Sequence, residues 1–279
     1  MRIGTMRVDP IIDGEILSEP AMLYPSVDPR EFEPYRGLLD PITGSFVQTL
    51  GGYLVRTGDR VVLVDAGIGS KAVYPFTGGG LRSSLLALGV RPEDITDVLF
   101  THLHIDHIGW VTQNGRPFFP NAALRCDKRD WDFFVTSGRE TEEWELAMSH
   151  PDEDPAPIRF GPVAAEMEFW SGGAEVLPGI EALDAAGHTP GTTVFLLSSG
   201  DERGALLGDL AHTQPELLNG WEFMVHADPA EAVRSITKFR DWLAAERIPC
   251  AAAHFPGMRW GQVTRTESGH EWVDLADQA

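Results

Sequence analysis

The chain has 279 residues, and its 42 acidic and 22 basic side chains give a net charge of −20. A surface this acidic repels phosphate backbones and anionic lipids, so we expect neither nucleic acid nor a membrane as a partner. The longest uncharged stretch, residues 185–200, is too short for a membrane-spanning helix. The two cysteines, Cys126 and Cys250, form no CxxC motif, and no apolar leader is evident near residue 1, which together favour a reduced, cytoplasmic location.

The first half of the chain is expected to alternate between strands and helices. Residues 1–44 hold six of the 20 prolines, so they are expected to form an irregular arm that either closes over a site or bridges subunits of a homodimer. Residues 45–56 and 60–64 flank Gly58 and Asp59 and predict a β-hairpin. Residues 81–88 predict a short helix, and residues 95–101 an apolar strand.

The second half repeats this alternation. Residues 193–198 and 205–207 predict another hairpin, and Asp228-Pro-Ala-Glu231 predicts the start of a helix that runs to about residue 247. A last strand is expected over 248–253. Several of these strands end at an Asp or His. Because ligand-type residues then gather along one edge, the pattern predicts a layered α/β architecture with a site at that edge.

The segment His102-Leu-His104-Ile-Asp106-His107 places four metal-ligand side chains within six residues. His102 and His104 point the same way in an extended chain, whereas Asp106 and His107 lie in the turn beyond it. One short loop can therefore serve two cations. Imidazole and carboxylate ligands suit zinc, with manganese, cobalt or iron as alternatives.

Three further ligand-type residues complete two such sites. His188 lies in a glycine-flanked turn, and Asp209 and His254 each follow a strand. A carboxylate such as Asp209 can bridge two metals, and a water between the metals becomes a hydroxide near neutral pH.

These motifs, HxHxDH, GHTPG, GD and a late His after a strand, resemble those of the metallo-β-lactamase-fold hydrolases over roughly residues 45–256. The resemblance implies one domain over residues 1–279, an αββα sandwich with two metals at one edge. It implies that His102, His104 and His188 hold one metal, that Asp106, His107 and His254 hold the other, and that Asp209 bridges them. Asp65, in VDAGIG, would orient a ligand histidine.

Within the family, the ligand set resembles that of the acyl-homoserine-lactone lactonases. The long insertion over residues 108–187 resembles the methyl parathion hydrolase branch and is expected to contribute to a pocket or lid. The lactonases carry a tyrosine three residues after the bridging Asp, where this chain has His212. The resemblance therefore implies a dinuclear hydrolase in which a metal-bridging hydroxide attacks a small neutral ester, lactone or organophosphate triester, with Asp106 and His212 as catalytic groups.

Large apolar side chains near the motifs are candidates for the substrate pocket, although ordinary core packing is an equally good interpretation of each. His150, His226 and His270 are expected to be surface residues. The pocket candidates are Trp110, Phe118, Phe119, Trp221, Phe223, Met224 and Phe255.

Two other activities of the same fold remain open. A persulfide dioxygenase would use a single iron and oxygen. A glyoxalase II-like thioesterase would need basic residues for a glutathione moiety, and Lys71, Lys128 and Lys238 are the only lysines.

Overall fold

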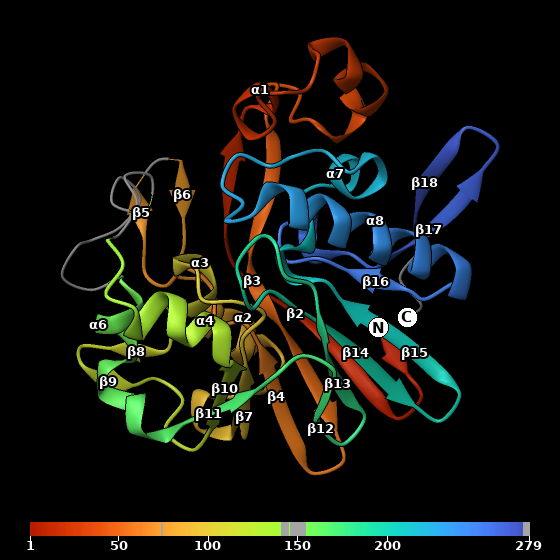
Figure 1. The fold of residues 1–279 in the computed structure, drawn as a ribbon. Coiled ribbons are helices and arrows are strands. Elements are labelled where there is room, and N and C mark those ends of the chain that lie inside the picture. The colour runs from red at the N-terminus through yellow and green to blue at the C-terminus, as the bar shows by residue number, and fades with distance from the viewer. Residues whose placement is uncertain (74, 141–144, 146–154, 276–279) are drawn as a thin grey trace.

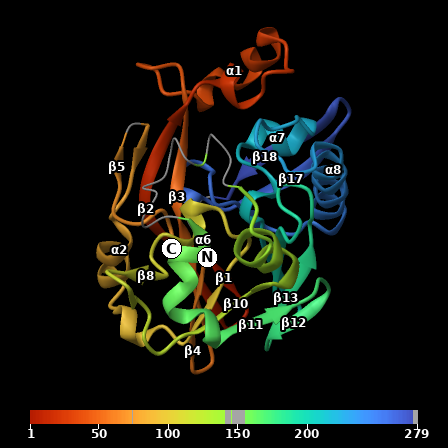
Figure 2. The ribbon, with the colours of Figure 1, turned by 60° about the vertical axis from the view of Figure 1, so that its left-hand side comes forward.

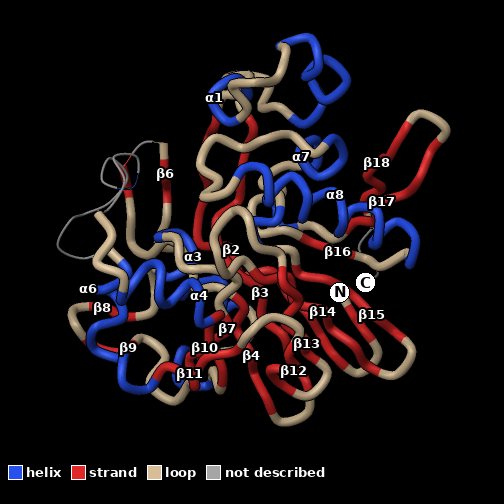
Figure 3. Tube along the Cα trace, viewed as in Figure 1, coloured by secondary structure: helices blue, strands red, loops and turns tan. Residues whose placement is uncertain are grey.

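The computed structural model describes residues 1–73, 75–140, 145 and 155–275. Within these residues, two large β-sheets pack face to face (Figures 1 and 3). The first sheet has the order β11 (Met167–Trp170), β10 (Ala123–Asp127), β7 (Asp97–Leu99), β4 (Arg60–Val64), β3 (Phe46–Thr57), β2 (Met6–Ser18), β6 (Phe76–Thr77) and β5 (Ala72–Val73), and β1 (Arg2–Ile3) pairs with β2.

The second sheet is formed by the C-terminal half of the chain. Its order is β12 (Ala174–Leu177), β13 (Ile180–Asp184), β14 (Thr193–Ser199), β15 (Glu202–Leu206), β16 (Cys250–Ala251), β17 (Gly261–Thr266) and β18 (Gly269–Asp274). A small separate ribbon pairs β8 (Thr112–Gln113) with β9 (Arg116–Pro117).

Helices cover the outer face of each sheet. The α-helices are α1 (Pro20–Leu23), α2 (Leu81–Ala87), α3 (Ile105–Ile108), α4 (Lys128–Trp131), α6 (Ala156–Phe160), α7 (Gln214–Asn219) and α8 (Pro229–Glu246). The 3-10 helices are η1 (Pro29–Leu38), η2 (Pro92–Asp94), η4 (Gly161–Glu166), η5 (Gly208–Leu210) and η6 (Pro256–Met258), and η3 (Asp132–Thr136) is a π-helical turn. No helix in the described part of the chain is both long and apolar enough to cross a membrane.

Three apolar layers confirm the predicted αββα sandwich. Side chains from both sheets meet between them, among them Val8 and Val62 from the first sheet and Phe195 and Leu206 from the second. A second cluster fills the space between the first sheet and helices such as α2. A third lies under α8, whose apolar face buries Ile236, Phe239 and Leu243 against the second sheet. Because each sheet is covered on both faces, central strands such as β3 and β14 are mostly buried.

The expectation of an irregular arm over residues 1–44 was wrong for its first part. Residues 6–18 form β2, which pairs antiparallel with β3 along its whole length (Figure 2). The buried side chains of Met6 and Val8 follow the alternation of a strand and face the second sheet, whereas Ile11 packs on the opposite face, among the side chains under the helices. Most of the prolines counted for the arm follow residue 19, where the chain does turn through α1 and η1.

Strand β16 was predicted as the last strand, but the hairpin of β17 and β18 extends the second sheet beyond it.

The position of the site follows from two pairs of parallel strands, one in each sheet. Strand β4 runs parallel to β7, and β15 runs parallel to β16. The carboxyl ends of each pair therefore meet at one edge, where the loops that follow carry Asp65, His102, Asp209 and His254.

Candidate metal centre

The His-rich loop leaves β7 and turns directly into α3. His104 is the N-cap of α3 and has an extended backbone, whereas Asp106 and His107 lie in the first turn of that helix. His102 and His104 therefore point to one side of the loop, and the helical turn brings Asp106 and His107 to the other. This is the division into two ligand sets that the spacing predicted.

The first set consists of His102, His104, His188 and Asp209, whose ligand atoms all lie within 4.8 Å of one another. His104 Nδ1 lies 2.9 Å from His102 Nε2 and 2.9 Å from His188 Nε2. Three imidazole nitrogens thus converge on one point. Burial lowers the pKa of all three rings, that of His104 to about 3, so all three are neutral, as metal ligands must be.

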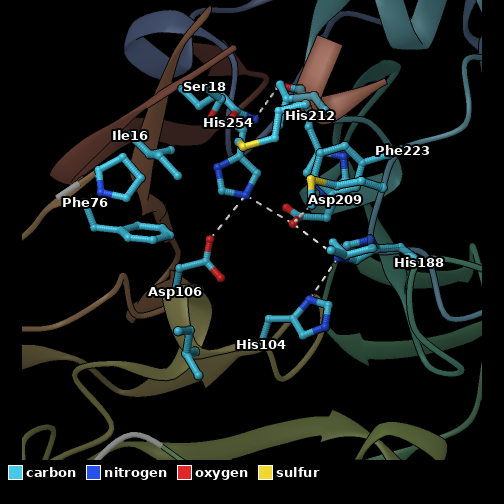
Figure 4. Close-up of a pocket in the computed structure, with 17 residues that line it drawn as sticks. Ile16, Ser18, Phe76, His104, Asp106, His188, Asp209, His212, Phe223 and His254 are labelled. Atoms are coloured by element: carbon cyan, nitrogen blue, oxygen red, sulfur yellow. Dashed lines mark hydrogen bonds and ion pairs between the residues drawn. The ribbon is translucent and has the colours of Figure 1, made fainter. Parts of the chain in front are cut away.

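The second set consists of Asp106, His107 and His254. Asp106 Oδ2 lies 3.4 Å from His254 Nε2 and 3.7 Å from His107 Nε2. Asp209 stands between the two sets (Figure 4). Its Oδ2 lies 3.5 Å from His102 Nε2 and its Oδ1 lies 3.3 Å from His107 Nε2, so the carboxylate faces both.

The donor atoms of this cluster fit two divalent cations. His107 Nε2 and Asp209 Oδ1 are buried and have no hydrogen-bond partner among the described residues. Leaving buried polar atoms unpaired costs free energy, and cations between the two sets would satisfy them. Burial opposes ionisation of Asp209, but the surrounding histidines outweigh it and hold the pKa of that carboxyl well below its usual range. Asp209 therefore carries a negative charge between the two sets.

Each ligand histidine of the second set is fixed at its other ring nitrogen. His107 Nδ1 lies 2.9 Å from Asp65 Oδ2, and His254 Nδ1 lies 3.0 Å from the carbonyl oxygen of Thr49. Asp65 also accepts hydrogen bonds from the backbone N–H and the hydroxyl of Thr101, both at 2.8 Å. Its φ of 62° is a conformation that non-glycine residues rarely adopt. Asp65 thus contacts His107, one of the candidate ligands, and the resemblance of the VDAGIG motif implies a contact of this kind.

His212 lies beside the two sets, with Nε2 3.3 Å from Asp209 Oδ2. Its Nδ1 lies 3.1 Å from Glu216 Oε2, and its backbone N–H donates to the same oxygen at 2.6 Å. Burial opposes protonation of His212, but the charges of Glu216 and Asp209 outweigh it and raise its pKa to about 9. His212 is therefore a cationic hydrogen-bond donor at the edge of the site in the metal-free protein.

A cavity of about 260 Å³ opens directly onto these residues. Its wall is mostly apolar, and Phe223 and Met224 belong to it. Much of the rest comes from the N-terminal segment, through Ile16 and Leu23. Within the described residues, none of the expected insertion over residues 108–187 lines this cavity. The cavity is lined by Ile16, Ser18, Met22, Leu23, Gln48, Pro75, Phe76, His104, Ile105, Asp106, His188, Asp209, His212, Phe223, Met224, Val225 and His254.

The other five pocket candidates lie in the core. The indole N–H of Trp110 donates to Asp13 at 2.9 Å, and Phe118 packs on the Trp110 ring with Phe119 behind it. Trp221 packs between the rings of Tyr24, Phe32 and Tyr35 of the N-terminal segment, and Phe255 packs on Trp272. Each of these side chains packs on other rings away from the cavity. Proximity to a motif in the sequence therefore did not predict which aromatic side chains line the cavity.

The three histidines that were expected at the surface differ in where they lie. His226 is buried and lies 3.2 Å from His188, so that expectation was wrong. His270 is half-buried on β18, and His150 lies outside the described residues. Glu216 is a further residue of the site that was not among those predicted from the sequence. Thr213-Gln-Pro-Glu216 has the pattern of a helix-capping box, and that signal placed a carboxylate four residues after His212.

Comparisons with known proteins agree with this geometry. Residues 52–250 match the metallo-beta-lactamase superfamily. An N-acyl homoserine lactonase of Bacillus sp. is 24% identical over 213 residues, which cover 70% of this chain and 76% of that protein. The N-acyl homoserine lactonase AiiA of Bacillus thuringiensis subsp. kurstaki is 23% identical over the same shares of both chains.

Solved structures show the same fold over the whole chain. AidC, a dizinc quorum-quenching lactonase in complex with a product, has a TM-score of 0.85 and 26% identity, covering 100% of this chain and 97% of that one. AbOPH, a hydrolase in the beta lactamase superfamily, has a TM-score of 0.83 and 21% identity over the same shares of both chains.

Proposed function

The chain belongs to the metallo-beta-lactamase superfamily, and from that premise we propose that it is a dinuclear metal-dependent hydrolase that opens lactones. Small esters, including aryl esters and organophosphate triesters, are the secondary substrate class. The observation that carries the proposal is the pair of ligand sets, joined by Asp209, at the base of an apolar cavity. Relatives with matching sequence are N-acyl homoserine lactonases, which supports the lactone as the preferred substrate.

His102, His104 and His188 would hold one metal, and Asp106, His107 and His254 the other, with Asp209 shared. Zinc is the metal we propose, because the ligand set suits it and a dizinc lactonase has the same fold. Two such ions, when bound, would supply Lewis acidity and a water of lowered pKa.

The residues of the chain supply positioning and proton transfer. The Asp106 carboxylate faces the cavity beside His254, so it can accept a proton from the attacking water and return it to the leaving alkoxide. His212 lies at the cavity wall, and Glu216 contacts its Nδ1, which leaves Nε2 as the ring nitrogen available to a substrate. A donor fixed there can hydrogen-bond the substrate carbonyl as negative charge develops on its oxygen.

The shape and polarity of the cavity favour a neutral substrate with an apolar tail. Ile16, Leu23, Phe76 and Phe223 offer hydrocarbon surface, and the protein carries a net charge of −20. Burying an acyl chain against such a wall contributes about 0.8 kcal/mol for each methylene. An anionic substrate would meet the acidic protein surface at long range.

The alternative activities have less support. A mononuclear iron dioxygenase would leave the set of Asp106, His107 and His254 without a role. A glutathione thioesterase would need cationic side chains at the cavity, and the residues that line it include no Lys or Arg within the described chain. As part of the same proposal we place the protein in the cytoplasm, and a homodimer is compatible with it.

The test is metal analysis of protein purified without added metal, combined with a panel of a homoserine lactone, an aryl ester, a phosphotriester and a cephalosporin. We expect two zinc-type ions per chain and the fastest turnover with the lactone. Chelation should abolish turnover, and zinc should restore it. If the protein contained one iron per chain, consumed oxygen and hydrolysed none of these substrates, the proposed hydrolase would be rejected in favour of the dioxygenase.

A further inference from the structure

His226 lies behind the metal centre, in the loop between α7 and α8. Its Nδ1 lies 3.2 Å from Nδ1 of His188, and its Nε2 lies 3.6 Å from Oε1 of Glu216. The side chains of His226 and Glu216 are fully buried. A carboxylate, a histidine and a ligand histidine therefore stand in a row that ends at the first ligand set.

Glu216 is itself held in place. Its Oε2 accepts a hydrogen bond of 3.0 Å from the hydroxyl of Tyr24 and one of 2.6 Å from the backbone N–H of His212. Its own backbone N–H donates to Oγ1 of Thr213, the N-cap of α7. The carboxylate thus has a fixed position from which to orient its neighbours.

The hydrogen bond between the two Nδ1 atoms requires a proton on one of them. If His226 carried it, neutral His188 would carry its own proton on Nε2, the atom that faces His104 and Asp209, and could not bind a cation through that atom. Neutral His226 would then have no proton on Nε2, so the lone pair of that atom would face the negatively charged Glu216 carboxylate. If His188 carries the proton instead, His226 keeps its proton on Nε2, facing Glu216, and His188 Nε2 has a free lone pair.

We propose that His226 and Glu216 are positioning residues that hold His188 in the tautomer with a proton on Nδ1, so that its Nε2 is ready for a metal. This inference rests on the metal-dependent function proposed above, and it adds two residues outside the expected ligand set. Partners of this kind fix the orientation of ligand histidines and contribute about 10–100-fold to metal affinity.

The first experiment compares zinc affinity, by competition with a chromophoric chelator, in His226→Phe and His226→Asn. Phenylalanine fills the space but accepts no hydrogen bond, so we expect one of the two ions to bind about 10–100-fold more weakly. The side-chain carbonyl of asparagine can accept from His188 Nδ1, so we expect most of the affinity to return. His270→Phe, on β18, is the matched control and should bind both ions as the unaltered protein does. Unchanged affinity in His226→Phe would overturn the proposal.

The second experiment needs no variant. Long-range ¹H–¹⁵N correlation spectra of the metal-free protein at neutral pH report which ring nitrogen of each histidine carries the proton. We expect the proton on Nδ1 of His188 and on Nε2 of His226, and the reverse assignment would overturn the proposal. Because neither measurement uses a substrate, a failure on the lactone panel would reject the proposed activity and leave this inference to be judged separately.

Discussion

The imidazole of His212 lies flat on the phenyl ring of Phe223, with ring centroids 3.5 Å apart and planes 14° apart. The ring of His254 is also nearly parallel to that of His212, with ring centroids 5.5 Å apart and planes 9° apart. Because Glu216 holds Nδ1 from behind, the stacked ring has one orientation, with Nε2 toward Asp209. A group fixed before the substrate arrives loses little entropy when it binds the developing charge.

We therefore expect His212→Phe to lower kcat for lactone opening by about 100-fold, because the ring can still stack but no donor remains. The two metals per chain should be retained, since His212 is not in the proposed ligand set. His212→Tyr restores a hydroxyl donor and should recover part of the loss. Steady-state kinetics with metal analysis of each variant would check this, and an unchanged kcat in His212→Phe would show that the ring is only structural.

Asp65→Asn should weaken the binding of one metal by about 10-fold. The amide removes the negative charge that orients His107. It also removes one of the two carboxylate oxygens that accept hydrogen bonds from Thr101. Zinc affinity measured by chelator competition is the readout. Asp59→Asn, in the exposed turn between β3 and β4, is the matched control. Equal affinities in the two variants would contradict the role given to Asp65.

Met224→Trp should select against long substrates. Met224 lines the cavity and is 46% exposed, so a larger ring there narrows the opening without displacing core atoms. We expect KM for a long-chain acyl lactone to rise about 10-fold, with little change for a short-chain one. Leu86→Trp places the same ring on α2, away from the cavity. If both variants changed KM alike, or neither did, the cavity would not hold the acyl chain.

Asp97→Asn should destabilise the first sheet by about 2 kcal/mol. Burial opposes ionisation of Asp97, but hydrogen bonds from Thr96, Arg125 and Arg60 outweigh it and lower its pKa. A lowered pKa in the folded state contributes stability above the unfolded value of about 4, and that contribution is lost as the pH falls toward the folded value.

The difference in unfolding free energy between Asp97→Asn and the unaltered protein should therefore be largest near pH 7 and shrink below about pH 4. Urea unfolding of the metal-free proteins measures it. Asp132→Asn, which removes an exposed ion pair with Lys128, should change stability little at either pH. A difference for Asp97→Asn that is constant with pH would show that the charge of Asp97 contributes nothing.

Local patterns in the sequence were sufficient to predict a layered α/β architecture with ligand-type residues at one edge, and the resemblance of the motifs implied the αββα sandwich and the seven candidate ligands, whose side chains the structure brings close together. Hairpin turns, a helix start at Asp228 and apolar strands are local signals, and each depends on residues close together in the chain. Ligands such as His102 and His104 are also local, because their spacing alone fixes which side of an extended chain they occupy.

Only the tertiary structure decided what surrounds those ligands. Ile16 and Leu23 reach the cavity because β2 pairs with β3, a contact between segments whose proximity no local pattern predicts. Trp110 turns into the core because a buried carboxylate, Asp13, accepts its N–H from a distant strand. His226 and Glu216 are placed by contacts across the fold, because His226 contacts His188 and Glu216 accepts a hydrogen bond from Tyr24. Apolar and hydrogen-bonding side chains pair with whatever the packed chain brings near, and the packing of the whole chain determines those partners.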